Sequence, residues 1–359
     1  MLRVRIINLD NLSGNEILGK PIYNEVGRTL LAQGTTLTPG YIEKLKNLGI
    51  SSVYIEDGIS SEVVLEETIT EETRQVSKRA INDMMEKYSR DGKLKNEGIL
   101  KSVNSIMDDI LMNKDVMINI SDIRAKDDEI YSHSVNVCVL STLIGIHLGY
   151  NMLRLKEIGI GAILHDIGKV KILGDKKIVE ERKKIGDLPE YIEKMHPKVG
   201  YDFLSQHNVC GAVSKVAVLM HHEKIDGSGY PLGLKNEEIH EVAMLVSICN
   251  AFDNMISGHN GLEAKPVYQA LEYLIGMSGH YYDANIVNKF TVNIAAFPSG
   301  SGVRLNTNER CLVIRQNHSL PLRPVLKVIY GKNNEKVAEP YELDLIKELT
   351  LFITQACEL

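Results

Sequence analysis

HDIGK at residues 165–169 and HHEKIDGSGYP at residues 221–231 are the two most informative stretches of this 359-residue chain. Adjacent histidines and a His-Asp pair are potential metal ligands, and they stand where an ordinary core segment would carry Leu or Val. The glycines around Tyr230 add backbone freedom next to these side chains. Together the two stretches predict a metal-dependent hydrolase.

The spacing of further residues supports one shared metal site. Glu129 and His133 are four residues apart, so on a helix they face the same way and can reach one ion. His165 and Asp166 are neighbours at another helix end, and a carboxylate can bridge two ions. Imidazole and carboxylate ligands without thiolate suit Fe or Mn better than structural zinc. Two such ions would activate water by lowering its pKa to about 7.

These residues resemble the HD-GYP domain, a branch of the HD phosphohydrolase superfamily whose members typically hydrolyse cyclic di-GMP. The likeness begins near Glu129, includes His196-Pro197-Lys198-Val199-Gly200 and continues to about Asp253. It implies two or three divalent metal ions, with Fe or Mn expected. Glu129 matches the acidic position found in those members of the family that bind three metals. The implied metal ligands are Glu129, His133, His165, Asp166, His196, His221, His222 and Asn250.

The resemblance also assigns residues to the reaction and to the substrate. Asp166 and Lys169 are the implied catalytic residues, with Lys169 contacting the scissile phosphate and stabilising the charge that develops there. Lys169, Gly229, Tyr230 and Asp253 are the implied substrate-binding residues. Two ordinary alternatives stay open: Lys169 as a solvated lysine near a helix end, and residues 226–230 as a plain loop.

Two departures from the family pattern keep a second function open. The family reads Asp-x-x-Asp after the GYP loop, whereas this chain has Asn250-Ala-Phe-Asp253, and a neutral amide is the weaker ligand for a hard cation. Residues 257–262, SGHNGL, lack the basic residues that usually grip the nucleotide. The alternatives are a catalytically weakened module that binds a cyclic dinucleotide or signals to a partner, and a phosphohydrolase of another nucleotide.

The chain is predicted to be mainly α, with an HD-type helical bundle between two smaller parts. Apolar residues recur at helical spacing within 67–113 and again beyond Asp122. Short β-type runs and glycine turns mark the first part, and β-type stretches return after Pro298. The expected divisions are an α+β module at 1–58, a linker and helical connector at 59–118, the catalytic domain at 119–297 and a β-containing extension at 298–359. The expected catalytic helices are 128–149, 152–167, 189–206, 210–222, 238–257 and 264–277.

Charge and composition indicate which kinds of binding partner and which cellular compartment to expect. With 41 basic and 47 acidic residues the net charge is −6, so binding to long nucleic acid is not expected. The five cysteines form no C-x-x-C pair, which favours a reducing cytoplasm. The apolar run at 137–148 is too short to span a bilayer, so membrane insertion is not expected. The helices before residue 114 are expected to pack within the chain, with a homodimer as the alternative.

Overall fold

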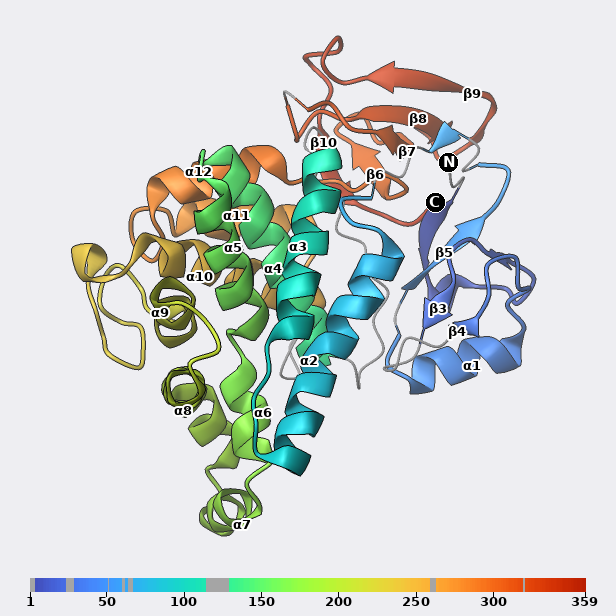
Figure 1. The fold of residues 1–359 in the computed structure, drawn as a ribbon. Helices are drawn as coiled ribbons and strands as arrows, with labels where there is room; N and C mark the ends of the chain where they lie inside the picture. The colour runs from blue at the N-terminus through green and yellow to red at the C-terminus, as the bar shows by residue number, and fades with distance from the viewer. Residues whose placement is uncertain are drawn as a thin grey trace.

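A computed structural model describes residues 4–23, 29–50, 52–59, 62–63, 67–113, 129–258, 263–318 and 320–359. A helical bundle occupies the centre of the molecule, with a small N-terminal unit beside it and a C-terminal sheet above both in Figure 1. The fold is thus mainly α with two small β-containing parts, as the sequence predicts. No helix among the described residues combines the length and apolar character that a membrane crossing requires.

The N-terminal unit has its own apolar core. Its three-stranded antiparallel sheet has the order β1-β5-β2, and α1 begins where the Thr38 side chain accepts a hydrogen bond from the Tyr41 amide. Leu18, Leu37 and Val53 are fully buried between these elements. The bounds are β1 Arg5–Asn8, β2 Ile17–Leu18, β3 Ile22–Tyr23, β4 Thr29–Leu31, α1 Pro39–Asn47 and β5 Ser52–Glu56.

The two connector helices, α2 (Glu71–Asp91) and α3 (Glu97–Met112), form a hairpin. Gly92 ends α2 in the left-handed conformation, with a φ of 65°, and its N–H donates to the Tyr88 carbonyl. Apolar side chains of both helices, Met84 and Val103 among them, belong to the same core as the bundle. The expected packing within the chain is therefore confirmed.

The bundle is built around α4, because this helix is apolar on nearly all sides and buries most of its surface. The helix expected at 152–167 ends three residues earlier, at Leu164, because the chain turns at His165 and Asp166, and a helix that was not predicted starts at Ile167. Two further helices, α7 and α12, were not predicted. The bounds are α4 Glu129–His147, α5 Met152–Leu164, α6 Ile167–Leu173, α7 Lys176–Ile185, α8 Leu188–His207, α9 Ala212–Met220, α10 Glu241–Ser257, α11 Val267–Gly276 and α12 Ala284–Asn293.

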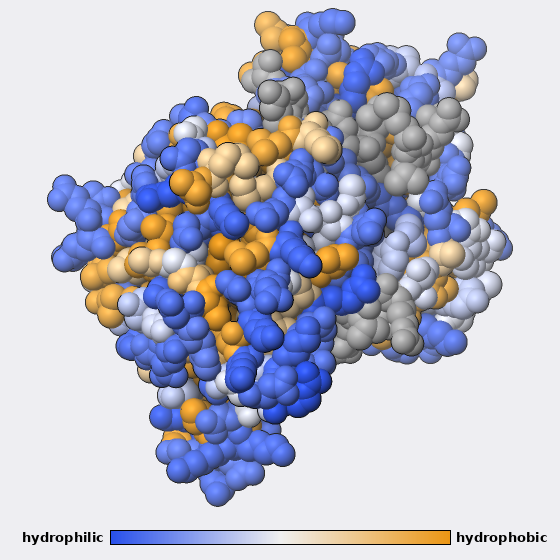
Figure 2. Space-filling model, viewed as in Figure 1, coloured by the Kyte–Doolittle hydropathy of each residue, from blue (hydrophilic) through white to orange (hydrophobic). Residues whose placement is uncertain are grey.

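Helix α7 escaped prediction because it lacks an apolar stripe. None of its residues is buried, and its sequence KKIVEERKKI is dominated by charge. The Asp175 side chain caps its first turn, and Gly186 closes it with a φ of 85°. The helix forms the protruding tip at the bottom of Figure 1, and the same tip is mostly hydrophilic in Figure 2.

The central strand of the C-terminal sheet, β7, is buried on both sides. Its five strands are antiparallel in the order β10-β6-β7-β8-β9. Along β7, Cys311 and Val313 join the bundle core, while Leu312 and Ile314 pack on the opposite side with Val63. This alternation follows from the two-residue repeat of a strand. The bounds are β6 Gly302–Leu305, β7 Arg310–Arg315, β8 Val325–Tyr330, β9 Lys336–Asp344 and β10 Ile353–Ala356.

Helices α6 and α8 approach each other so closely that only glycine fits between them. A Cβ on Gly168 would lie 2.0 Å from the His196 carbonyl oxygen and 2.8 Å from the Gly200 nitrogen. Both obstacles are backbone atoms, which do not move aside as a flexible side chain does. This contact brings the turn at His165 and Asp166 against the middle of α8.

We therefore expect Gly168→Ala to lower the free energy of unfolding by roughly 3 kcal/mol, because a methyl group must be forced between two backbones. The control is Gly40→Ala in α1, where a new Cβ meets nothing within 4 Å. Alanine at that helical position should be neutral or stabilising by up to about 1 kcal/mol. Urea unfolding of both variants checks this, and equal stabilities would contradict the assigned contact.

Candidate metal centre and adjoining cavity

The expected ligands come from the ends of several helices and from the middle of one helix, and they lie close together. His133 comes from α4, His165 and Asp166 from the turn between α5 and α6, and His196 from the middle of α8. His221 follows the last residue of α9. All five are at most 3% exposed, so the cluster lies inside the bundle.

Hydrogen bonds fix the ring orientation of four histidines. His133 Nδ1 lies 2.7 Å from Asp253 Oδ2, and the other three rings point Nδ1 at a backbone carbonyl of their own helix. A carbonyl only accepts, so each of these Nδ1 atoms carries the proton and Nε2 of the neutral ring is left with its lone pair. The carbonyl contacts are His165 with Ala162 at 2.7 Å, His196 with Ile192 at 3.0 Å and His221 with Val218 at 2.8 Å.

The Nε2 atoms that remain meet in two pairs. His133 and His165 have their Nε2 atoms 3.1 Å apart, and so do His196 and His221. Two lone pairs at this distance repel unless a cation lies beside them. Asp166 faces both pairs, with Oδ1 3.2 Å from His196 Nε2 and Oδ2 3.5 Å from His165 Nε2. The carboxylate therefore stands where it can serve two ions.

Two buried polar atoms also fit a site that binds a cation. Asp166 Oδ1 and His222 Nε2 have no hydrogen-bond partner within the part of the chain that the structure describes. Leaving such atoms unpaired costs about 1–3 kcal/mol each, and more for a charged group. A divalent cation would satisfy both. The ligand atoms form two sets within 4.8 Å: Asp166, His196, His221 and His222 in one, and His133, His165 and Asp166 in the other.

Protonation states suit a metal as well. Burial lowers the pKa of His165 to about 4 and that of His221 and His222 well below the ordinary value. Burial alone would raise the pKa of Asp166, but His165, Lys169 and His196 together hold that pKa well below its usual range. Near neutral pH His165, His221 and His222 are thus neutral and Asp166 is ionised, which is the form of these ligands that binds divalent metal.

Asn250 and Asp253, one turn apart on α10, approach His133 from opposite sides of its ring. Asn250 Oδ1 is 2.9 Å from His133 Nε2 and also accepts a hydrogen bond from Asn254 at 2.8 Å. Asp253, expected to bind substrate, is fully buried and is held by the His133 ring and by Asn136, whose amide donates to it at 3.1 Å. Asp253 thus contacts the Nδ1 side of His133, away from the Nε2 atom that faces His165, and orients this ring. Asn136 was not anticipated, although it follows His133 by one helical turn.

Some expected residues fall outside what the structure describes. Glu129 is the first residue of α4, but its side chain is not among the described ones. Residues 259–262 of the unusual SGHNGL segment are likewise outside the described ranges.

Lys169 lies one turn beyond Asp166 and reaches back to it, with Nζ 2.8 Å from Oδ2. Both residues border a cavity of about 690 Å³, a volume typical of small-molecule sites. One side of the cavity is the metal cluster and the other is the start of α8. The lining residues are Ile130, His133, Asp166, Lys169, Leu173, Leu188, Pro189, Glu190, Ile192, Glu193, His222 and Asn254.

Tyr230 packs against the cluster with its ring. The ring stacks on His222 with centroids 4.5 Å apart and planes 15° apart, and Lys194 lies over it at 4.3 Å. The hydroxyl donates to Glu193 Oε1 at 2.5 Å, and burial together with this carboxylate raises the Tyr230 pKa. The Tyr230 hydroxyl, which was expected to donate to a phosphate, donates to Glu193 in this structure. The sequence did not single out Glu193.

The loop that carries Tyr230 is held by close backbone packing. A Cβ on Gly229 would lie 2.4 Å from Glu223 Cα, so this glycine, expected to bind substrate, permits the loop to fold back on α9's end. The buried Glu223 carboxylate accepts from the Leu232 amide at 2.7 Å and the Leu234 amide at 3.0 Å. Glu223 is a second residue that the sequence did not single out, although it directly follows the paired histidines.

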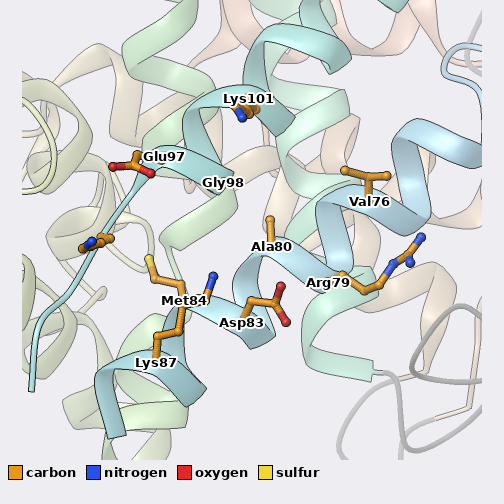
Figure 3. Close-up of a pocket in the computed structure, with 10 residues that line it drawn as sticks. Val76, Arg79, Ala80, Asp83, Met84, Lys87, Glu97, Gly98 and Lys101 are labelled. Atoms are coloured by element: carbon orange, nitrogen blue, oxygen red, sulfur yellow. The ribbon is translucent and has the colours of Figure 1, made fainter. Parts of the chain in front are cut away.

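A second, smaller cavity of about 370 Å³ lies between α2 and α3. Figure 3 shows it bordered by charged side chains, with Ala80 and Gly98 between them. Its lining has no histidine, so it offers none of the imidazole ligands found in the bundle. The larger cavity is the one that joins a metal-ligand cluster.

Comparison with known proteins agrees with this arrangement. Residues 116–286 match the HD domain family, and residues 302–359 match the KOW domain associated with HD domain. A cyclic di-GMP phosphodiesterase of Pseudomonas aeruginosa is 28% identical over 242 residues, which are 67% of this chain and 57% of that protein. One of Thermotoga maritima is 35% identical over 170 residues, which are 46% of this chain and 45% of that protein.

The chain spans about half the length of the curated relatives that it matches. Among solved structures, an HDG"Y"P protein from Bdellovibrio bacteriovorus is similar with a TM-score of 0.45 and 18% identity, over 80% of this chain and 98% of that one. The part of the chain that matches the HD domain contains both the HDIGK and the HHEKIDGSGYP motifs, and the related sequences are those of cyclic di-GMP phosphodiesterases.

Proposed function

We propose that this protein is a metal-dependent phosphodiesterase that opens cyclic di-GMP to the linear dinucleotide, with GMP as the product of a second cleavage. The observation that carries the proposal is the buried cluster in which Asp166 faces two pairs of histidine Nε2 atoms at the wall of a cavity of about 690 Å³. The likeness to curated cyclic di-GMP phosphodiesterases supports this choice of substrate.

The two ligand sets would each hold one divalent ion. His133, His165 and Asp166, with Asn250 beside them, would form one site, and Asp166, His196, His221 and His222 the other. Fe or Mn is the proposed metal, since the donors are imidazole and carboxylate without thiolate, and Glu129 is the proposed ligand of a third ion. When bound, the ions would supply an activated water and offset charge on the phosphate.

The chain's own residues prepare the site in three ways. The carbonyl contacts hold the histidine rings in one tautomer, so no reorganisation is needed when a ligand arrives. The Lys169 ammonium lies beside the buried Asp166 carboxylate and places a positive charge next to it. Because Lys169 also borders the cavity, its ammonium can move to a phosphoryl oxygen and stabilise the charge that develops there.

Replacement of Asp166 and of Lys169 should have different effects. Asp166→Ala removes the oxygens that both ligand sets share, so bound Mn or Fe and hydrolysis of cyclic di-GMP should each fall by at least about 100-fold. Lys169→Ala leaves the ligands in place and should slow turnover by about 10–100-fold with metal content retained. The measurements are metal analysis of anaerobically purified protein and a turnover assay.

His318→Ala is the matched control for that experiment, because His318 is an exposed histidine of the C-terminal part. Its metal content and rate should equal those of the wild type. An Asp166→Ala protein that keeps its activity would disprove the metal mechanism.

Asn250 carries a separate expectation, because its oxygen already lies 2.9 Å from His133 Nε2. Asn250→Asp should raise the affinity for divalent metal by about 10-fold, since an anionic oxygen replaces a neutral one in a poorly solvated site. Turnover at limiting metal should rise with it. Titration of metal-free protein with Mn measures the change.

Asn104→Asp on the exposed face of α3 adds the same charge away from the cluster and should alter neither quantity. If neither the wild type nor Asn250→Asp hydrolyses cyclic di-GMP while both bind it, the protein is a receptor that uses the same fold. The neutral residue at position 250 is the observation that favours this second function.

The metal-free protein should lose stability as the pH falls from 6.5 towards 4. An unfolded chain protonates His165 near pH 6.5, whereas burial lowers the folded pKa to about 4. In this window the unfolded state binds more protons, so the free energy of unfolding decreases on acidification, by at most about 1.4 kcal/mol per pH unit for each such histidine. Above pH 6.5 the contribution is constant.

Urea unfolding in the presence of a chelator at several pH values tests this. His165→Gln should show a shallower pH dependence than the wild type, and the exposed-site control His318→Gln should not. Identical slopes for wild type and His165→Gln would mean that His165 is not held neutral in the folded state.

A further inference from the structure

The cavity beside the metal cluster has two chemically different sides. His133, Asp166, Lys169 and His222 line the side that suits a phosphate. Another part of the lining is the first two turns of α8, which contributes apolar side chains and two carboxylates, Glu190 and Glu193. Building on the proposed function, we infer that Glu190 and Glu193 accept hydrogen bonds from the guanine edge of the dinucleotide and thereby select guanine over adenine.

The position of these two carboxylates is the first support. They stand three residues apart on α8, so both face the cavity, and like charges at this spacing disfavour the helix. Glu193 is held in place by the Tyr230 hydroxyl at 2.5 Å, and its side chain is 40% exposed. Only Oε1 is engaged in that contact, which leaves Oε2 to meet a ligand. Glu190 is exposed and makes no hydrogen bond or ion pair within the described chain.

The charge of the substrate is the second support. A cyclic dinucleotide carries two phosphates, and carboxylates in its cavity would repel it if they met nothing but phosphate. Glu193 Oε1 lies only 3.9 Å from His222 Nε2, so a carboxylate stands close to the cluster. The repulsion is offset if the carboxylates meet hydrogen-bond donors of the ligand. The bases are the part of a dinucleotide that provides such donors.

Guanine and adenine differ in the edge that they present. Guanine has N1–H and an N2 amino group side by side, so one carboxylate can accept two parallel hydrogen bonds. Adenine has an amino donor next to the N1 acceptor, whose lone pair would face the carboxylate. A bidentate contact of this kind is worth about 1–3 kcal/mol of discrimination between bases, or roughly 5–150-fold.

Apolar neighbours complete a surface for a base. Leu173 lines the cavity and is 47% exposed, although leucine is usually buried. Leu188 and Ile192 lie on the same stretch of α8 as the two carboxylates. The flat face of a purine can cover these side chains while its edge meets Glu190 or Glu193.

A purely structural explanation exists for Glu190, because a negative charge in the first turn of α8 favours the helix dipole. That role would affect the stability of the protein, but it would not change the preference for guanine over adenine. Base selectivity is therefore the property that separates the two explanations. Gln is the suitable replacement, since it removes the charge and one acceptor while its remaining oxygen can still accept from Tyr230.

The experiment compares cyclic di-GMP with cyclic di-AMP as substrates of Mn-loaded full-length protein. It also compares the linear products pGpG and pApA as ligands in calorimetry. The variants are Glu190→Gln, Glu193→Gln and the double substitution, with Glu180→Gln and Glu181→Gln on exposed α7 as matched controls. We expect the wild type to prefer the guanine compounds by at least 10-fold in kcat/KM and in affinity. The double variant should lose most of this preference, mainly through KM, and the controls should keep it.

The outcomes separate this inference from the proposed function. Turnover of cyclic di-GMP with equal preference for both bases, or with a preference that survives the double substitution, overturns the inference alone. Absence of turnover together with guanine-selective binding that depends on Glu190 or Glu193 overturns the proposed enzyme and supports the inference. Absence of both turnover and selective binding overturns both.

Discussion

The structure of the site depends on the hydrogen bonds that tie Nδ1 of His133, His165, His196 and His221 to an oxygen. Without them the imidazoles are free to rotate and to exchange tautomers, and the Nε2 lone pairs do not converge. Three of the four acceptors are carbonyls within the same helix, so the orientation is fixed by helix geometry. His133 differs because its acceptor is Asp253 on another helix, which links the orientation of this ring to the packing of α4 against α10.

The histidine rings can converge because glycines stand where the helices and the Tyr230 loop approach most closely. Gly168 and Gly200 allow α6 and α8 to touch through their backbones, and Gly229 allows the Tyr230 loop to lie on the end of α9. The cluster therefore combines many buried polar groups with unusually close backbone contacts. Such an arrangement is costly in the absence of a ligand, because polar atoms are left unpaired in the interior.

The sequence predicted the ligand types and most of the helices, since both depend on local patterns. It placed His165 and Asp166 at a helix end, but it did not predict that a short second helix, α6, starts directly after them at Ile167. It also did not predict the contact of Asp253 with His133. Asn250 and Asp253 share one face of α10, and only the distance across to α4 decides that Asp253 turns behind His133. Glu193 and Asn136 act through partners far away in sequence, which a local pattern does not reveal.

The first strand of the N-terminal unit is hydrogen-bonded to the C-terminal part, and Lys20 adds an ion pair with Glu67 before the connector helices. The Ile6 amide donates to the Gly300 carbonyl at 3.1 Å, and the Gly300 amide donates to Val313 at 2.8 Å. Gly300 has a φ of 88°, and a Cβ there would lie 3.2 Å from the Val4 carbonyl. The sheet behind Gly300 shares its apolar core with the bundle. The first strand is therefore connected, through one hydrogen bond and this shared core, to the helices that hold the histidines.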